Sequence, residues 1–285
     1  MTKLIESIQD IKAALSQNKW STKPIGLVPT MGALHAGHIS LIKLAREECK
    51  TVVVYIFVNP LQFAKDEDLK EYPRDLQTDL KICEENNIDY VFVPSEKEIY
   101  PDINNINKQK TLPPNNLAGI LCGKTRVEHF SGVTTVLKRF LEIIEPDFVY
   151  FGEKDLQQVY IVRWLIGEYK FPILLRSCPI IRESNGLAYS SRNKYLTNFQ
   201  KDIASALYKA LKLAKENTRS GIFTVSKSTL ESLIFLSQFA EIKVEYFEAR
   251  GKTNLEKVSD DQKKGFYYLI AAKVANVRLI DNIEV

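Results

Sequence analysis

The chain has 285 residues, 45% of them hydrophobic, so it can bury a large core and is not expected to be disordered. Its 39 basic and 35 acidic residues leave a net charge of only +4, which argues against a nucleic-acid surface and suits an enzyme with small anionic ligands. No stretch approaches a membrane span, the N-terminal layout is not that of a signal peptide, and the four cysteines are scattered, so we expect a cytoplasmic protein with reduced thiols.

Residues 4–18 have the apolar spacing of an amphipathic helix, and residues 25–28 form a short apolar run that predicts a strand. The next ten residues precede a second helical pattern and are Pro29, Thr30, Met31, Gly32, Ala33, Leu34, His35, Ala36, Gly37 and His38. Gly32 allows a tight turn, and Gly37 leaves one side of the first helical turn bare. This arrangement of strand, loop and helix N-terminus predicts a site for a phosphate group. His35 and His38, three residues apart, would point to the same side and donate hydrogen bonds to it.

Other roles are open to these histidines, which could cap the helix, lie on the surface or form half of a zinc site. Zinc is disfavoured because the chain has only three histidines and no cysteine pair with ligand spacing. The strand before the glycines and the helix after them favour a nucleotide site.

Further elements follow in alternation. Strands are predicted at 51–58, 89–93, 146–151 and 173–178, and helices at 74–87, 132–144 and from 152 through 166, while 101–116 is predicted to be a surface loop. Asn59 and Gln62 stand at the carboxyl end of one strand, and Lys154 and Gln158 lie one turn apart beyond another. This order predicts an α/β fold with an open, doubly wound parallel sheet that binds ligands beyond the carboxyl ends of its strands.

The pattern changes near residue 181, so we predict two domains, 1–180 and 181–285. Residues 182–194 are polar and turn-rich and predict a mobile loop. Helices at 198–216 and 224–238 and strands at 242–248, 266–273 and 278–284 predict a small α+β domain.

Histidines at a helix start together with a distant Ser-Ser-Arg loop resemble the paired signatures of the nucleotidyltransferase superfamily, which includes the class I aminoacyl-tRNA synthetases. The sequence is more specifically similar to the pantothenate synthetase family, and this resemblance spans nearly the whole chain. The matching segments are residues 29–38, 57–63, 72–74, 129–133, 151–158, 190–193 and 278–283.

The resemblance implies a Rossmann-like enzyme that joins pantoate to AMP with release of pyrophosphate and then lets β-alanine displace AMP. It implies His38, His35, Lys154 and Arg192 as catalytic residues, with Arg126 and His129 near the site. It places ATP on residues 29–38 and on Gly152, Glu153, Lys154, Asp155, Ile181, Tyr189, Ser190, Ser191 and Arg192. Pantoate would bind Gln62, Gln158 and Asn59, and β-alanine would lie near Gln62. No protein metal ligands are implied: Mg²⁺ would come on the ATP phosphates. The enzyme would be a homodimer without nucleic-acid or membrane partners.

Some positions depart from the family pattern, among them Leu61, Leu156 and Tyr189, whose ring could stack on adenine. Thr78 stands where relatives often carry an acidic residue and Ile82 where a polar one is usual, so Asp79 is not expected to orient a glutamine or the metal. Other functions remain open at this point: a nucleotidyltransferase that keeps AMP on its product, a small synthetase-like protein that charges a carrier, or a nucleotide-binding protein without catalysis.

Overall fold

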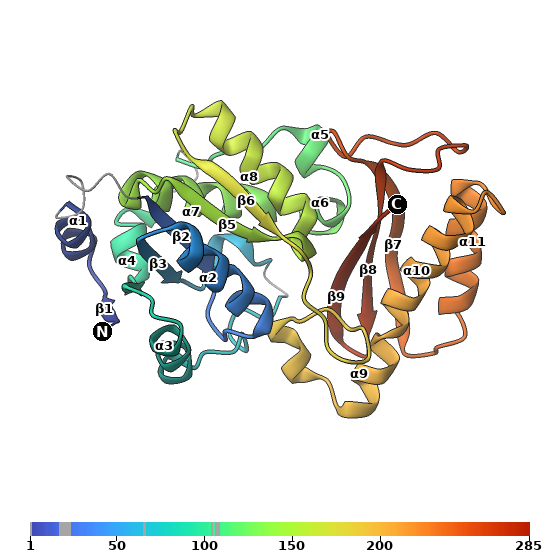
Figure 1. The fold of residues 1–285 in the computed structure, drawn as a ribbon, viewed down its shortest axis with the longest axis horizontal. Coiled ribbons are helices and arrows are strands. Elements are labelled where there is room, and N and C mark those ends of the chain that lie inside the picture. The colour runs from blue at the N-terminus through green and yellow to red at the C-terminus, as the bar shows by residue number, and fades with distance from the viewer. Residues whose placement is uncertain (1, 17–23, 65–66, 104, 106–108) are drawn as a thin grey trace. The chain divides into compact units, whose positions relative to one another are not determined.

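A computed structural model of the protein describes residues 2–16, 24–64, 67–103, 105 and 109–285. The chain forms two compact units (Figure 1). The first comprises Met1–Glu153 and Gln158–Pro179, and the second comprises Lys154–Gln157 and Ile180–Val285. Lys154 therefore belongs to the second unit, although it follows a strand of the first.

The first unit contains a six-stranded sheet in the order β1-β4-β3-β2-β5-β6, and all its strands are parallel. These strands are β1 (Lys3–Ile5), β2 (Ile25–Thr30), β3 (Thr51–Ile56), β4 (Tyr90–Phe92), β5 (Phe148–Gly152) and β6 (Leu174–Cys178). The predicted parallel α/β sheet is confirmed. The loops after β2 and β3 leave neighbouring strands at the same edge of the sheet.

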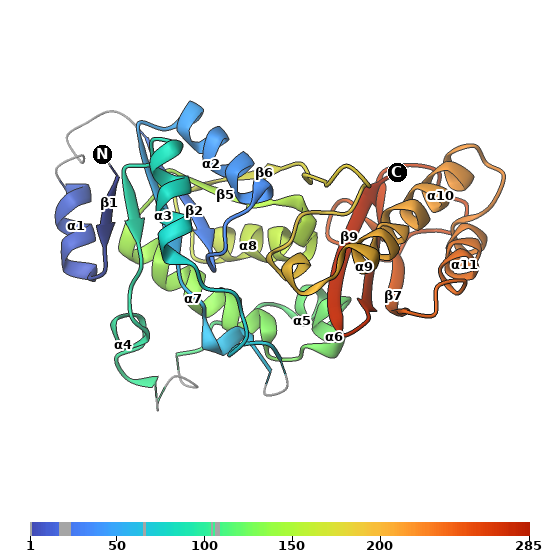
Figure 2. The same ribbon diagram turned by 90° about the horizontal axis from the view of Figure 1, so that it is seen from below.

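Helices cover both faces of this sheet (Figures 1 and 2). Successive strand residues point to opposite faces, so Leu27 packs in one core and Val28 in the other. The core on the first face is shared by α1 (Ile8–Ser16), α7 (His129–Ile144) and α8 (Leu156–Glu168), and the core on the second by α2 (Ala36–Glu48) and α3 (Leu76–Glu85). Shorter elements of this unit are η1 (Pro60–Gln62), α4 (Glu96–Ile99), α5 (Asn115–Ala118) and α6 (Cys122–Thr125).

The predicted helix over 4–18 is wrong at its start. Residues Lys3–Ile5 form β1, which pairs with β4, and the helix begins only at Ile8. Three residues are too few to show a strand period, and the pairing depends on Tyr90–Phe92, far along the chain. Residues 17 and 18 lie outside the described residues. The surface loop predicted at 101–116 ends inside α5, and residues 104 and 106–108 are also outside the described part.

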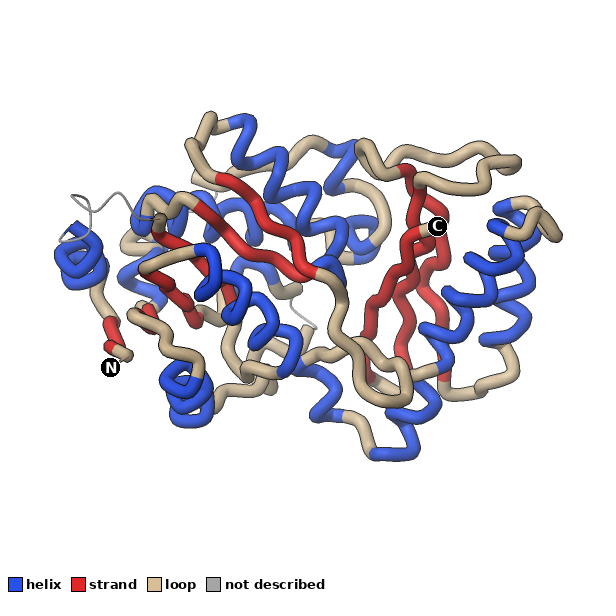
Figure 3. The backbone as a smooth tube through the Cα atoms, viewed as in Figure 1, coloured by secondary structure: helices blue, strands red, loops and turns tan. Residues whose placement is uncertain are grey.

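The second unit has an antiparallel sheet of β7 (Ile242–Gly251), β8 (Phe266–Val274) and β9 (Val277–Glu284), drawn in red in Figure 3. Its helical elements are η3 (Glu153–Asp155), which starts one residue before the unit does, η4 (Ser191–Tyr195), α9 (Asn198–Ala204), α10 (Ala206–Arg219) and α11 (Val225–Leu236). The helix predicted at 198–216 is thus two helices, α9 and α10, which meet at Ser205. The predicted α+β character is confirmed. Within the described ranges, no helix is long and apolar enough to cross a membrane.

Candidate active site

The loop between β2 and α2 turns sharply. Gly32 has φ +80° and Ala33 has φ +51°, both in the left-handed region. A Cβ at Gly32 would lie 2.9 Å from the Asp79 Oδ2 atom. The Thr30 hydroxyl donates to the Tyr55 carbonyl at 2.9 Å and accepts the Gly32 N–H at 3.1 Å. The glycine is needed for both its conformation and its lack of a side chain.

Asp79 holds the rest of this turn. Its side chain is on the buried face of α3 with 1% of the residue exposed, and its oxygens accept the N–H groups of Ala33 at 2.9 Å and Leu34 at 2.7 Å. Charge-assisted bonds of this kind are stronger than bonds between neutral groups. These bonds hold the histidine loop, a role that sequence analysis did not consider for Asp79. An acidic residue one turn before Cys83, within the buried stripe of a helix, was the available signal.

His35 and His38 begin α2 and form a reciprocal cap. The Nδ1 atom of His35 accepts the Gly37 N–H at 3.1 Å, and the Nδ1 atom of His38 accepts the His35 N–H at 3.4 Å. The two rings lie with centroids 4.1 Å apart. Because each Nδ1 is an acceptor, the neutral rings carry their proton on Nε2. His35 and His38 can therefore cap the helix and also donate hydrogen bonds to a ligand, because the cap occupies Nδ1 and leaves the proton on Nε2.

The turn after β3 is fixed by a buried amide. Asn59, with 1% of its surface exposed, donates from Nδ2 to the Gln62 Oε1 atom at 3.2 Å and to the Gly132 carbonyl at 3.1 Å. Its Oδ1 atom accepts the Tyr100 hydroxyl at 2.8 Å. Burial raises the pKa of Tyr100, so this hydroxyl keeps its proton and remains a donor. With its amide engaged in this way, Asn59 orients Gln62.

Gln62 joins this turn to the histidine loop. Its Nε2 atom donates to the Met31 Sδ atom at 2.8 Å. The structure thus brings together two of the segments that sequence analysis singled out, 29–38 and 59–62, which follow the adjacent strands β2 and β3. Gln158, on the first turn of α8, is half-buried in the same unit.

Of the other predicted site residues, Gly152 and Glu153 end the first stretch of the first unit, and those described next lie in the second unit. Lys154 has its Nζ atom 3.6 Å from the Asp155 Oδ2 atom, and its carbonyl accepts the Asn282 Nδ2 group at 3.2 Å. Ser190 is the N-cap of η4 and accepts the Arg192 N–H at 3.3 Å. Ser191 is buried, whereas Ile181, Tyr189 and Arg192 are half-buried.

The segment predicted to be a mobile loop, 182–194, is anchored at its first residue. The Arg182 guanidinium binds both carboxylate oxygens of Asp281, at 2.6 and 2.9 Å, and stacks on the Tyr208 ring. Burial raises the pKa of Asp281, and the Arg182 charge opposes that rise. These contacts attach the start of this segment to β9, and Tyr189, Ser190 and Arg192 follow in the same segment.

A parallel sheet with a capped His-x-x-His helix start at the carboxyl end of one strand is typical of the nucleotide-binding α/β enzymes. The family model described as pantoate-beta-alanine ligase matches residues 3–284, and the chain belongs to this family. It is an enzyme that condenses pantoate with β-alanine at the expense of ATP.

Individual members of the family match this chain over nearly its full length. A pantothenate synthetase of Cytophaga hutchinsonii is 44% identical over 99% of this chain and 98% of its own. The crystal structure of pantothenate synthetase from Thermus thermophilus aligns with a TM-score of 0.92 at 35% identity, over 99% of both chains. That of pantoate-beta-alanine ligase from Francisella tularensis, complexed with beta-gamma ATP and beta-alanine, aligns with a TM-score of 0.82 at 35% identity, over 100% of this chain and 98% of its own.

Proposed function

We propose that the reaction proceeds through a pantoyl-adenylate on the residues described above. The pantoate carboxylate attacks the α-phosphorus of ATP and pyrophosphate leaves. The β-alanine amine then attacks the acyl carbon, and AMP leaves as the amide bond forms. Negative charge grows on the phosphoryl oxygens in the first step, so the protein has to position the reactants and stabilise charge.

In this proposal His35 and His38 supply the hydrogen bonds to those oxygens, and His38 is the proton donor. The observation that carries it is the pair of Nδ1 atoms bonded to the α2 backbone, which leaves Nε2–H as the donor of each neutral ring. The backbone of the loop 29–38 would hold the ATP phosphates at the helix N-terminus.

Lys154 and Arg192 would supply full positive charge to the phosphates, and Ser190 and Ser191 hydroxyl donors. We assign the remaining ATP contacts to Gly152, Glu153, Asp155, Ile181 and Tyr189, with the Tyr189 ring against adenine.

Gln62 and Gln158 would bind pantoate, and Gln62 would also lie beside β-alanine. Gln62 accepts from Asn59 through Oε1 and uses one Nε2 hydrogen toward Met31, so the second Nε2 hydrogen is the donor that it would offer to a carboxylate or hydroxyl oxygen. Asn59 is buried and would act through Gln62 rather than by contact with pantoate.

Mg²⁺ is expected on the ATP phosphates. In the described part of the chain no group of three or more histidine, cysteine or acidic residues could hold a metal ion, and Asp79 is engaged by backbone amides. Bound there, Mg²⁺ would neutralise charge on the leaving pyrophosphate. We further propose that the enzyme works in the cytoplasm as a homodimer.

Product analysis tests the proposed route. Pyrophosphate should appear with ATP and pantoate alone, and free AMP only when β-alanine is added. An enzyme that keeps AMP on its product would release none, and a protein that only binds nucleotide would release no pyrophosphate.

Two substitutions test the assigned residues. His38→Ala and Lys154→Ala should each abolish pyrophosphate release while the circular dichroism spectrum stays that of the wild type. Normal turnover in either variant would remove that residue from the mechanism.

A further inference from the structure

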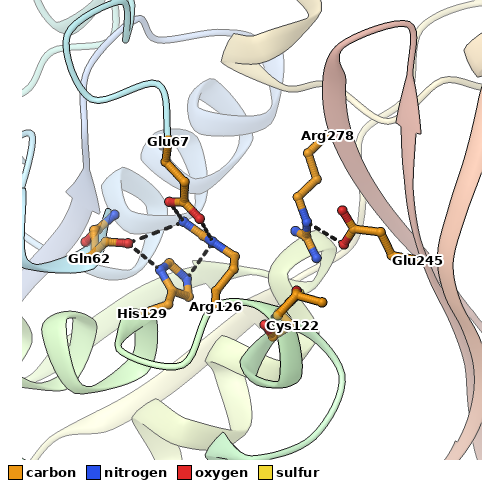
Figure 4. A network of polar contacts seen from close by, with 8 residues as sticks. Gln62, Glu67, Cys122, Arg126, His129, Glu245 and Arg278 are labelled. Atoms are coloured by element: carbon orange, nitrogen blue, oxygen red, sulfur yellow. Dashed lines mark hydrogen bonds and ion pairs between the residues drawn. The ribbon is translucent and has the colours of Figure 1, made fainter. Parts of the chain in front are cut away.

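Gln62 is held from a second side by a network that the reaction does not itself use. The His129 Nδ1 atom lies 2.8 Å from the Gln62 carbonyl oxygen, and the Arg126 Nη1 atom lies 3.0 Å from the His129 Nε2 atom (Figure 4). A carbonyl only accepts and a guanidinium only donates. His129 therefore carries its proton on Nδ1 and accepts through Nε2, the opposite tautomer to His35 and His38.

Arg126 is itself fixed by a two-point ion pair. Its Nε and Nη2 atoms lie 2.5 and 2.7 Å from the two carboxylate oxygens of Glu67, and Nη2 also donates to the Gln62 carbonyl at 3.3 Å. The side chains of Arg126 and Glu67 are only 13% and 20% exposed. An ion pair with this geometry and burial gives the guanidinium a defined direction.

The start of α7 also fits closely against η1. A Cβ at Gly132 would lie 2.1 Å from the Leu61 carbonyl oxygen and 2.7 Å from the Gln62 nitrogen. His129 is one turn earlier on the same helix, so the backbone of Gln62 is in contact with two successive turns. A shift of His129 would therefore move Gln62 and not only a surface side chain.

We propose that His129 and Arg126 are positioning residues that set the place of Gln62, and that pantoate binding requires His129 to be neutral. This inference rests on the proposed role of Gln62 in binding pantoate. A proton on Nε2 would remove the acceptor for Arg126 and place two cations 3.0 Å apart. Among the contacts of the described residues, the charged groups on this side of the ring are Arg126 and, behind it, Glu67, while the Phe130 ring has its centroid 4.8 Å from that of His129. Acid should therefore loosen the Gln62 turn.

The test compares His129→Ala with His129→Asn, whose amide can still donate to the Gln62 carbonyl. His129→Ala should raise the KM for pantoate about three- to tenfold, the effect of one hydrogen bond, and leave the KM for ATP unchanged. His129→Asn should restore most of the loss. Equal increases in both KM values would mean a general structural role and overturn the proposal, as would an unchanged KM for pantoate.

A pH series supplies a second readout. In the wild type the KM for pantoate should rise as the pH falls through the range in which imidazole gains a proton. Other groups of the site can also respond to acid, so the measurement compares the rise in KM in the wild type with that in His129→Asn, where the rise should be smaller. An identical rise in both proteins would refute the requirement for a neutral ring.

Gln62→Ala separates this inference from the proposed function. If Gln62→Ala impairs pantoate use but His129→Ala does not, only the positioning role fails. If Gln62→Ala leaves the KM for pantoate unchanged, both the assignment of Gln62 and the inference built on it are wrong.

Discussion

Replacing Asp79 by asparagine should damage ATP use without removing volume from the core. The asparagine oxygen can still accept one of the two N–H groups, from Ala33 or Leu34, but its amino group would face the other, which loses its acceptor. A hydrogen bond to a charged group contributes about 1.5–3 kcal/mol, so we expect the free energy of unfolding to fall by about 2 kcal/mol. The loop carrying His35 then keeps only one of its two anchors, at a turn where Ala33 is in the left-handed region.

The expected change in kcat/KM for ATP follows from the same loss of free energy. If the loop must be restored to its position each time ATP binds, a loss of about 2 kcal/mol lowers kcat/KM for ATP about thirtyfold, since about 1.4 kcal/mol is a factor of ten. The assay is initial-rate pyrophosphate release at varied ATP, with urea unfolding followed in parallel.

Asp75→Ala is the matched control. Asp75 caps the same helix by accepting the Thr78 N–H at 3.1 Å, and losing such a cap costs about 1 kcal/mol of stability. This bond closes the first turn of α3 and does not hold the histidine loop, so ATP kinetics should stay normal. A wild-type kcat/KM for ATP in Asp79→Asn, or an equal loss in Asp75→Ala, would refute the reasoning.

Three further predictions concern packing, a buried ion pair and the thiols. Gly132→Ala should lower the free energy of unfolding by about 1–3 kcal/mol and raise the KM for pantoate, because its Cβ would meet the η1 backbone. The control is Gly167→Ala, whose Cβ has open space around it and which should raise the free energy of unfolding by about 0.5 kcal/mol. Equal melting temperatures for the two variants would contradict this prediction. Arg182→Ala leaves the buried Asp281 carboxylate unpaired and should lose about 3–5 kcal/mol at neutral pH. Without the guanidinium the pKa of Asp281 rises further above its unfolded value, so the folded variant takes up a proton more readily. The loss of unfolding free energy, measured with urea, should therefore become smaller at lower pH. A loss that does not change with pH would contradict this prediction. All four cysteines are buried, and burial raises the pKa of two of them to about 12 and about 11, so a thiol reagent at pH 8 should label none before unfolding.

Local patterns were sufficient for much of the architecture. The apolar runs at β2 and β3 and the alternation of strand and helix predicted the parallel sheet, because hydrophobic period and length depend on neighbouring residues. The same patterns placed segments 29–38 and 59–62 at the ends of strands. The contact between Gln62 and Met31 agrees with that placement. The boundary of the first helix was wrong, because β1 depends on a partner strand more than 80 residues away.

What the sequence determined, then, is the order and type of the main elements and the motifs at their ends. The supports of the site were decided only by the tertiary structure. Asp79 reaches Ala33 across 46 positions, and His129 reaches Gln62 across 67. The hydrogen-bond partner of a buried polar side chain is chosen by the packing of distant elements. For that reason neither the role of Asp79 nor the tautomer of His129 could be deduced from the residues near them.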